Sequence, residues 1–465
     1  MNMMHFTGKY RLFAVTTILL LTGVAGGEEP LKYWPQWRGP LSTGLAPHAD
    51  PPVKWSETKN IRWKTPLDGV GHSTPIIWKN HIFVTTAIPY GKVITPKGPE
   101  IDGVHDYLPV TQAMGFAVIA INRTDGKILW KTTVRKALPH EGAHYTGTMA
   151  SNSPVTDGKN IYAFFGARGL YCLGFKGNVK WGKDLGKMRI KHGHGEGSSP
   201  AIYENTVIVN WDHADQSFIA AFDKRTGKQL WKTNRDEVTS WSTPIVVKVD
   251  GKPQVIVNGT KRMRVYSLET GKVIWKCAGL SANIVASPVS SDGIVYAGSS
   301  YVKRGMMAIR LSGAKGDISS SDNVLWRRRA GTPYVPSLLL SGQGLYFLNH
   351  YQPVLWRVNV KTGKDPEGPY RLYGLRNVYA SPVAAAGRVY ITDRSGATMV
   401  LSDDKKLKIL ATNRLDEPIN ASAAVVGKEI FLRSDQHLYC ISKSPKKVEK
   451  QTSATTSQPS ARNLP

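Results

Sequence analysis

The chain has 465 residues, a formal net charge of +27 at pH 7 and only three cysteines. A disulfide framework needs an even set of regularly spaced cysteines, so this composition excludes a small disulfide-stabilised fold. The length allows several domains or one large repeat array, and the basic surplus favours either acidic surroundings, such as anionic polymers and membrane surfaces, or a plain solvated surface.

The first 27 residues have the pattern of a secretory signal peptide. Lys9 and Arg11 give a positive start, an apolar run spans residues 12–21, and small residues follow at 23–27. The run is short for a transmembrane helix, and a retained membrane anchor is the alternative. No cysteine follows the run, which disfavours a lipoprotein. We therefore expect an exported chain, periplasmic or extracellular, with no transmembrane span after cleavage.

After a lead-in segment at residues 28–54, one motif recurs from 55 to 442, in which small residues precede a proline. Its copies end at Pro75, Pro154, Pro200, Pro244, Pro288 and Pro382, with weaker copies at Ser337 and Ser422. Two successive intervals are 44 residues long. The first interval is longer, and we assign the excess to an insertion at about 89–115. The copies define eight units.

Each unit holds short runs of β-branched and aromatic residues separated by Gly and Asp turns, which predicts antiparallel strands joined as hairpins. Four strands in a unit of about 40–45 residues are typical of a propeller blade. No segment has sustained helical periodicity. The sequence therefore predicts an all-β, eight-bladed β-propeller, because a pair of unrelated β-sandwiches does not explain the recurrence.

The two ends of the repeat region complement each other. The last unit, at 421–442, supplies only three strands, and the missing strand is found at 60–64. We expect this N-terminal strand to complete the last blade, which would leave no open sheet edge. The tail at 443–465 is basic, rich in Ser, Thr, Gln and Pro, and lacks aromatic residues, so we expect it to be disordered.

A turn of the form Thr-Gly-Lys, separated from a Trp by two residues, recurs at 226–231 and 270–275. It resembles the tryptophan-docking repeat of the pyrroloquinoline-quinone (PQQ)-like propeller family, over roughly residues 55–442. Residues 34–40 are also similar to the lead-in of exported family members. The resemblance implies that the tryptophan packs between neighbouring blades, and the matching residues are Trp63, Trp130, Trp181, Trp231, Trp275 and Trp326. Units six and seven lack it.

In a blade whose strands run A to D from the axis outwards, the D-to-A and B-to-C connections share one face, and loops carry function more often than strands. In the first three units these connections are rich in histidine and acid. Imidazole and carboxylate together suit zinc, copper, iron or nickel, and also acid–base chemistry. The ligand or metal candidates are His72, His140, His144, His192, His194, Glu196, Asp212 and His213, and the insertion adds His105 and Asp106. Solvated or hydrogen-bonded loop histidines are the alternative.

The same face is basic and aromatic further round the ring. Such residues could hold an anionic ligand, including a quinone with carboxylates, by charge-assisted hydrogen bonds and stacking. The candidates are Arg168, Trp241, Lys261, Arg262 and Arg394, near Tyr301, Lys303, Arg304, His350 and Tyr351. An interaction surface and plain solvated loops are the alternatives.

The repeat resembles that of the propeller component of the outer-membrane β-barrel assembly machine (BamB-like), which implies a monomeric binding or scaffold protein of the cell envelope without a cofactor. Its partner would be another envelope protein or an anionic polymer; nothing indicates specific nucleic-acid binding. The alternatives are a PQQ-dependent dehydrogenase and a metal-assisted enzyme. Quinoprotein dehydrogenases typically carry adjacent cysteines beside PQQ, whereas Cys172, Cys277 and Cys440 are far apart. We expect these three to be buried free thiols.

Overall fold

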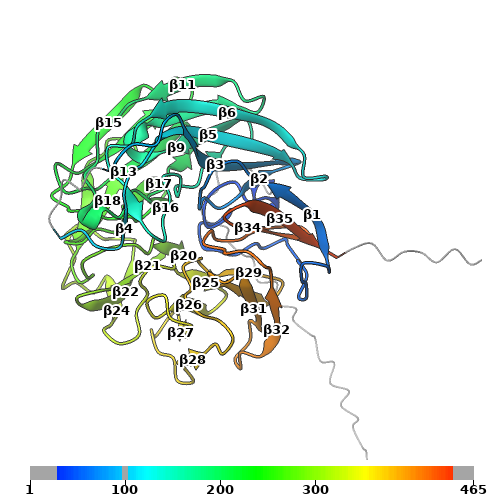
Figure 1. Ribbon diagram of the computed structural model, residues 1–465. Coiled ribbons are helices and arrows are strands. Elements are labelled where there is room, and N and C mark those ends of the chain that lie inside the picture. Colours follow the sequence, from blue (N-terminus) through cyan, green and yellow to red (C-terminus); the bar gives the residue numbers. More distant parts are fainter. Residues whose placement is uncertain (1–28, 97–102, 444–465) are drawn as a thin grey trace, which may run out of the picture.

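The computed structural model describes residues 29–96 and 103–443, and eight β-sheets radiate from a common axis within them (Figure 1). The fold is the predicted all-β, eight-bladed propeller. The predicted signal peptide at 1–27 and the predicted tail, apart from Lys443, lie outside the described residues. Across the described ranges, no helix has both the length and the apolar character needed to cross a membrane.

Each blade has four antiparallel strands, A to D from the axis outwards. Blade 1 comprises β2 (Ile76–Trp78), β3 (His81–Tyr90), β5 (Ala113–Asn122) and β6 (Ile128–Ala137), and blade 2 comprises β8 (Val155–Thr156), β9 (Asn160–Phe164), β10 (Leu170–Gly174) and β11 (Val179–Lys183). Blade 3 comprises β12 (Ala201–Tyr203), β13 (Thr206–Trp211), β14 (Phe218–Asp223) and β15 (Gln229–Asn234). Blade 4 comprises β16 (Ile245–Val249), β17 (Lys252–Val257), β18 (Met263–Ser267) and β19 (Val273–Cys277), with β23 (Gly316–Asp317) added as a fifth strand.

The remaining blades follow the same plan. Blade 5 comprises β20 (Val289–Ser291), β21 (Ile294–Ser300), β22 (Arg304–Arg310) and β24 (Val324–Arg328), and blade 6 comprises β25 (Leu339–Ser341), β26 (Gly344–Leu348), β27 (Val354–Asn359) and β28 (Tyr370–Arg371). Blade 7 comprises β29 (Val383–Ala385), β30 (Arg388–Thr392), β31 (Ala397–Ser402) and β32 (Ile409–Arg414). Blade 8 comprises β33 (Ala424–Val426), β34 (Glu429–Arg433), β35 (His437–Ser442) and β1 (Ile61–Pro66). Short 3-10 turns lie at Pro30–Lys32, Gly166–Arg168 and Lys191–Gly193.

The predicted closure is confirmed, because β1 pairs antiparallel with β35, so that Trp63 lies opposite Cys440 (Figure 1). The first strand of the ring is therefore the outer strand of the last blade. Glu429 reinforces this junction, since its carboxylate binds Arg62 and accepts a 2.6 Å hydrogen bond from Arg123 of blade 1. Closure leaves neither end of the ring as an unpaired blade.

The recurrent motif before each proline forms a hydrogen-bond ladder around the axis. The backbone N–H of the residue before each proline, or before its equivalent, donates to the hydroxyl of the corresponding residue in the next blade. The seven bonds, each 2.9 or 3.0 Å long, join Thr74 to Ser153, Ser153 to Ser199, Ser199 to Thr243, Thr243 to Ser287, Ser287 to Ser337, Ser337 to Ser381 and Ser381 to Ser422. The repeat thus needs Ser or Thr there, because the hydroxyl satisfies a buried N–H.

Five tryptophans form a second set of links between blades. Each indole N–H donates to a backbone carbonyl of the following blade: Trp63 to Arg123, Trp130 to Phe175, Trp181 to Lys224, Trp231 to Leu268 and Trp326 to Val360, at 2.7–3.1 Å. Each ring also lies against the glycine of the turn it meets; a Cβ on Gly271 would come within 2.5 Å of Trp231. The Gly and the Trp of the motif are therefore partners across a blade junction.

Trp275 departs from this arrangement. Its side chain is fully buried, but its N–H has no hydrogen-bond partner within the described chain. In blade 5 the connection between β22 and β24 is longer, and part of it forms β23, which pairs in parallel with β19 and places Gly316 opposite Trp275. This added strand stands where the other blades present their Gly turn.

The lead-in segment crosses the face that carries the A-to-B and C-to-D turns, here called the lower face. Trp34 bonds to Ile77 of blade 1 in both directions, and Gly44 and Ala46 both bond to Ala384 of blade 7. Between these points Arg38 is 2% exposed and donates to the carbonyls of Leu338 and Pro382. The segment is thereby fixed across the ring.

Candidate functional site

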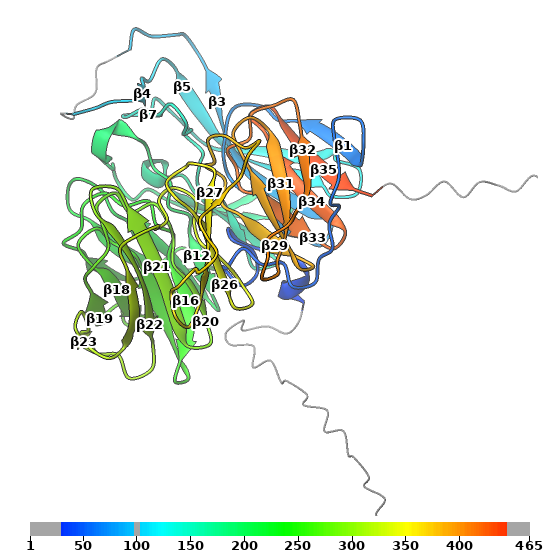
Figure 2. The same ribbon diagram turned by 90° about the horizontal axis from the view of Figure 1, so that it is seen from below.

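The D-to-A and B-to-C connections end on the opposite, upper face. In blade 1 the connection between β3 and β5 is extended, and its β4 (Tyr107–Leu108) pairs with β7 (Ala143–His144), which lies between blades 1 and 2. Figure 2 shows β4 and β7 projecting from this face. The pairing brings the predicted insertion beside the histidine-rich connections.

Four histidines meet there, and we call them the histidine cluster: His105, His144, His192 and His194. The ring centroid of His105 lies 4.6 Å from that of His192 and 5.0 Å from that of His194. The ring centroid of His144 lies 4.6 Å from that of His194. Burial, and then the neighbouring imidazoles, lower the pKa of His194 to about 4. Burial also lowers the pKa of His144, so both rings are neutral at pH 7.

The remaining histidine candidates have partners elsewhere. His72 lies 3.2 Å from Asp435 of blade 8, His140 is 2.6 Å from the carbonyl oxygen of Met188, and His213 is 3.2 Å from that of Gln216. Within residues 29–96 and 103–443, no three His, Cys, Asp or Glu side chains are arranged to hold a metal ion. The structure therefore does not bring the eight ligand candidates together as one metal centre.

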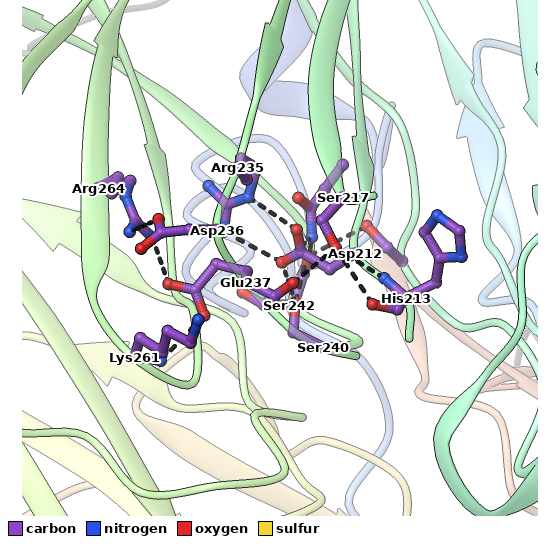
Figure 3. A network of polar contacts seen from close by, with 12 residues as sticks. Asp212, His213, Ser217, Arg235, Asp236, Glu237, Ser240, Ser242, Lys261 and Arg264 are labelled. Atoms are coloured by element: carbon purple, nitrogen blue, oxygen red, sulfur yellow. Dashed lines mark hydrogen bonds and ion pairs between the residues drawn. The ribbon is translucent and has the colours of Figure 1, made fainter. Parts of the chain in front are cut away.

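The part of the upper face that surrounds the axis of the ring is here called the mouth. Asp212 does not belong to it, because its side chain forms a buried ion pair (Figure 3). Both carboxylate oxygens accept hydrogen bonds from Arg235, at 2.7 and 3.0 Å, and Ser240 donates to one of them at 2.6 Å. Both charged side chains have no exposed surface. A buried pair of this geometry satisfies its own charges and leaves none for a ligand.

Lys261 and Arg262, two of the anionic-ligand candidates, form the loop that holds Glu237. Figure 3 shows Lys261 beside Glu237. The Glu237 carboxylate accepts the backbone N–H groups of Lys261 and Arg262 at 2.9 and 3.1 Å and also pairs with Arg264. The Arg262 side chain lies 3.0 Å from Asp317. The Glu237 contacts join blades 3 and 4, the Arg262–Asp317 pair adds β23 from the blade 5 connection, and together they assign the loop a role in packing.

A small pocket beside the histidine cluster contains two carboxyl groups. Arg168 pairs with Glu196 at 2.8 Å, and the Glu141 carboxylate accepts the N–H of Ile190 at 3.0 Å. Burial raises the pKa of Glu196, and it raises that of Glu141 to about 7. The Glu196 side chain lies so close to the backbone of residue 166 that only glycine fits there, because a Cβ on Gly166 would lie 1.7 Å from Glu196. Arg168, predicted to bind an anion, is thus already neutralised.

Aromatic side chains continue round the mouth from blade 5 to the histidine cluster, and we call this set the tyrosine arc. Its successive ring contacts are Tyr301–Tyr334 at 5.8 Å, Tyr334–His350 at 4.9 Å, His350–Tyr351 at 6.1 Å and Tyr351–Tyr379 at 5.2 Å. The guanidinium of Arg394 then lies 5.3 Å from the Tyr379 ring and 5.6 Å from that of Tyr145. Tyr145 contacts His144 at 4.6 Å.

The cations along the arc are not held in direct ion pairs within the described residues, although Arg394 interacts electrostatically with the Asp435 carboxylate of blade 8. Lys303, Arg304 and Arg394 form no ion pair with any described carboxylate. Arg394 is held by a 2.9 Å hydrogen bond from its Nε to Asn420, and its two terminal nitrogens have no hydrogen bond within the described residues. Of the five anionic-ligand candidates, Lys261 and Arg394 have no ion pair among the described residues, and Arg394 is the one whose guanidinium is set between aromatic rings.

Sequence reasoning missed Tyr334 and Tyr379, although the repeat contains a signal for one of them. Tyr379 stands three residues before Pro382, where other units have Trp241 before Pro244 and His72 before Pro75. Trp241 lies 6.3 Å from His194 and donates to the carbonyl oxygen of Gly195 at 2.7 Å. This repeat position faces the mouth, so a large aromatic residue three positions before the proline could have identified Tyr379 as a residue of the site.

Eight blades, seven of four strands and one with the added β23, are linked by the tryptophan docking and the hydroxyl ladder. They define an eight-bladed β-propeller of the PQQ-like repeat class. A family model described as outer membrane protein assembly factor BamB matches residues 115–366 and 217–452. The chain belongs to this family.

Individual relatives are distant. The tetrathionate hydrolase of Acidithiobacillus ferrooxidans is 25% identical over 301 residues, which cover 59% of this chain and 53% of that protein, so the chain spans about half the length of this relative. BamB from Moraxella catarrhalis has a TM-score of 0.52 at 14% identity, covering 70% of this chain and 93% of that one. A quinohemoprotein alcohol dehydrogenase from Pseudomonas putida HK5 has a TM-score of 0.52 at 10% identity, covering 95% and 84%. These likenesses show the fold.

The residues of the mouth do not fit a quinone with its metal ion in the arrangement that the dehydrogenase resemblance implies. The three cysteines are buried, unpaired and far apart in sequence, as expected. Burial raises the pKa of Cys172 to about 12, which makes its thiol unreactive. The described side chains also supply no set of metal ligands.

Proposed function

We propose that this chain is an exported binding protein of the cell envelope, which captures another envelope macromolecule at the mouth of its upper face. The observation that carries the proposal is the unpaired guanidinium of Arg394, set between the rings of Tyr145 and Tyr379. A free cation flanked by aromatic surface is a recognition element for an anionic group. The partner is an envelope protein or an anionic polymer.

The two faces of the ring differ in a way that supports this proposal. The lead-in segment covers the middle of the lower face through bonds to blades 1 and 7. On the upper face, by contrast, Tyr145, Tyr301 and Tyr351 are 49%, 43% and 38% exposed. Exposed aromatic side chains that gather at one place mark interaction sites on propellers and other scaffolds.

A binding role also agrees with the state of the titratable groups. Asp212 and Glu196 are each neutralised by an arginine, and His72 lies beside Asp435. A catalytic acid or base must reach a proton of the substrate, and these groups are turned to partners within the fold. Arg394 and the rings around it, by contrast, are not engaged in ion pairs within the described residues.

Position-specific photo-crosslinking in the source cells tests the proposal. A photoreactive phenylalanine would replace Tyr351 at the mouth or, as a control, Val273, which is 46% exposed on the outer strand β19. We expect a defined adduct in the envelope fraction from position 351 and none from 273. Equal labelling from both positions, no adduct from 351, or a chain that stays in the cytoplasm would overturn it.

A further inference from the structure

We infer, on the basis of the function proposed above, that the ligand of the mouth is an acidic polysaccharide, a carbohydrate chain with carboxylate or sulfate groups that lies along the tyrosine arc. The inference rests on the spacing of aromatic surface and cations over blades 5, 6, 7 and 1. Aromatic side chains there are accessible, and positive charge lies at both ends of the arc.

The aromatic rings are arranged as platforms. Tyr301 stacks on Tyr334 with an interplanar angle of 19°, and Tyr351 stacks on Tyr379 with an angle of 11°. In each pair one ring is well exposed, Tyr301 by 43% and Tyr351 by 38%. Such a surface suits a sugar ring, which has an apolar face bounded by hydroxyl groups. Burial raises the pKa of Tyr334 and Tyr379 to about 12, so these phenols add no negative charge.

The charges of the mouth favour an anion at more than one place. Arg394 offers two terminal nitrogens whose fork matches a carboxylate or a sulfate. Lys303 and Arg304 follow Tyr301 at the far end of the arc and are exposed. Cations at both ends of a run of rings are suited to an extended polyanion rather than to a single sugar.

Single-stranded nucleic acid also binds to aromatic and cationic surfaces, because a base stacks on one exposed ring face as a sugar does. The exported location proposed above favours the polysaccharide, and the titration with oligo-dT separates the two ligands. An acidic peptide would use the cations but would leave the platforms unused.

The test is a set of calorimetric titrations of the chain from residue 28 to its end, which lacks only the predicted signal peptide. The ligands are polygalacturonate, which carries carboxylates, dextran sulfate, neutral dextran, polyglutamate and oligo-dT. We expect at least one acidic glycan to bind about tenfold more tightly than both dextran and polyglutamate, with an affinity that falls as salt is added. The two acidic glycans distinguish carboxylate from sulfate as the recognised group.

Four variants separate this site from general charge attraction. Arg394→Gln and Tyr351→Ala should each weaken glycan binding about tenfold, whereas Tyr351→Phe retains the ring and should bind like the parent chain. Lys228→Gln removes an equal charge from a lower-face turn and should have no effect. Melting curves of each variant show whether the ring is intact.

Three results would overturn the inference: no acidic glycan binds, Tyr351→Ala binds as well as Tyr351→Phe, or oligo-dT binds more tightly than any glycan. If crosslinking from position 351 captures a protein while all glycans fail, the proposed binding function stands and the polysaccharide is excluded. If crosslinking from position 351 gives no adduct and no glycan binds, the proposed binding function and the polysaccharide inference are both excluded.

Discussion

Arg38 Nη2 donates a hydrogen bond to the carbonyl oxygen of Leu338 at 2.7 Å, across 300 positions of sequence. Its Nη1 donates to the carbonyl oxygen of Pro382 at 2.8 Å, so one side chain joins the lead-in segment to blades 6 and 7. No described carboxylate pairs with it, and burial lowers its pKa to about 9. Carbonyl dipoles alone thus hold this buried cation.

Arg38→Ala should therefore loosen the lead-in segment. We expect the free energy of unfolding in urea to fall by about 2 kcal/mol or more, because two strong hydrogen bonds are lost and buried volume is left empty. Arg225→Ala, at an exposed turn, is the control and should change it by less than about 0.5 kcal/mol. Equal losses in the two variants would contradict the assigned role of Arg38.

Tryptophan docking can be tested with two glycines that have the same backbone conformation. Gly271 has φ +69° and lies against Trp231, whereas Gly293 has φ +72° and nothing within 4 Å of a Cβ. Gly293→Ala should cost about 1 kcal/mol for the left-handed backbone, and Gly271→Ala should cost about 1–3 kcal/mol more because the Cβ displaces the indole. Urea unfolding of both variants measures the difference; similar losses would show that the indole can move aside freely.

The propeller was predictable because its stabilising contacts repeat. Ser199 and Thr243 recur at one interval, so the eight units could be counted from the sequence, whereas the hydrogen bonds between them appear only in the structure. Trp275 follows the same pattern, yet its N–H finds no carbonyl among the described residues, because the strand β23 is inserted there. An interruption by a neighbouring blade leaves no mark on the motif itself.

The mouth was less predictable because its contacts join different connections. Arg394 and Tyr145 lie 249 positions apart, and neither one alone indicates that the guanidinium rests on the ring. Asp212 looked like a loop ligand, but Arg235, at the end of its own blade, neutralises it. Charge pairing depends on which loops meet, and this follows from packing rather than from composition.

The closure of the ring predicts a large effect of truncation. A chain that begins at residue 70 lacks β1, so the edge of β35 and the Cys440 side of blade 8 would be exposed. We expect its melting temperature to fall by about 10 °C or more, with aggregation through the open edge. Removal of residues 444–465 is the control and should leave the transition in place. A truncated chain that melts normally would show that β1 is dispensable.

The histidine cluster predicts a loss of stability in mild acid. Burial lowers the pKa of His194 to about 4, below its ordinary 6.5, so the unfolded chain binds this proton more tightly. The stability contributed by the neutral ring is thus present above pH 6.5 and is lost as the pH falls towards 4. His194→Gln should flatten that part of the curve by about 1 kcal/mol, after allowance for partial exposure. The free energy of unfolding of both chains at pH 7.5 and pH 5 measures this effect. An equal pH dependence in the parent chain and in His194→Gln would contradict the assigned role of His194.

Glu141 predicts the opposite dependence. Burial raises its pKa to about 7, above the ordinary 4.5, so the folded chain binds this proton more tightly than the unfolded chain does. The stability that Glu141 contributes is therefore complete below pH 4.5 and is lost as the pH rises through 7. Glu141→Gln keeps an oxygen for the N–H of Ile190 and removes the charge, so it should gain about 1 kcal/mol over the parent between pH 5 and 8. Glu269→Gln, at an exposed turn, should show no such gain. Urea unfolding at the two pH values decides, because a gain shared by both variants would reflect net charge rather than the pocket.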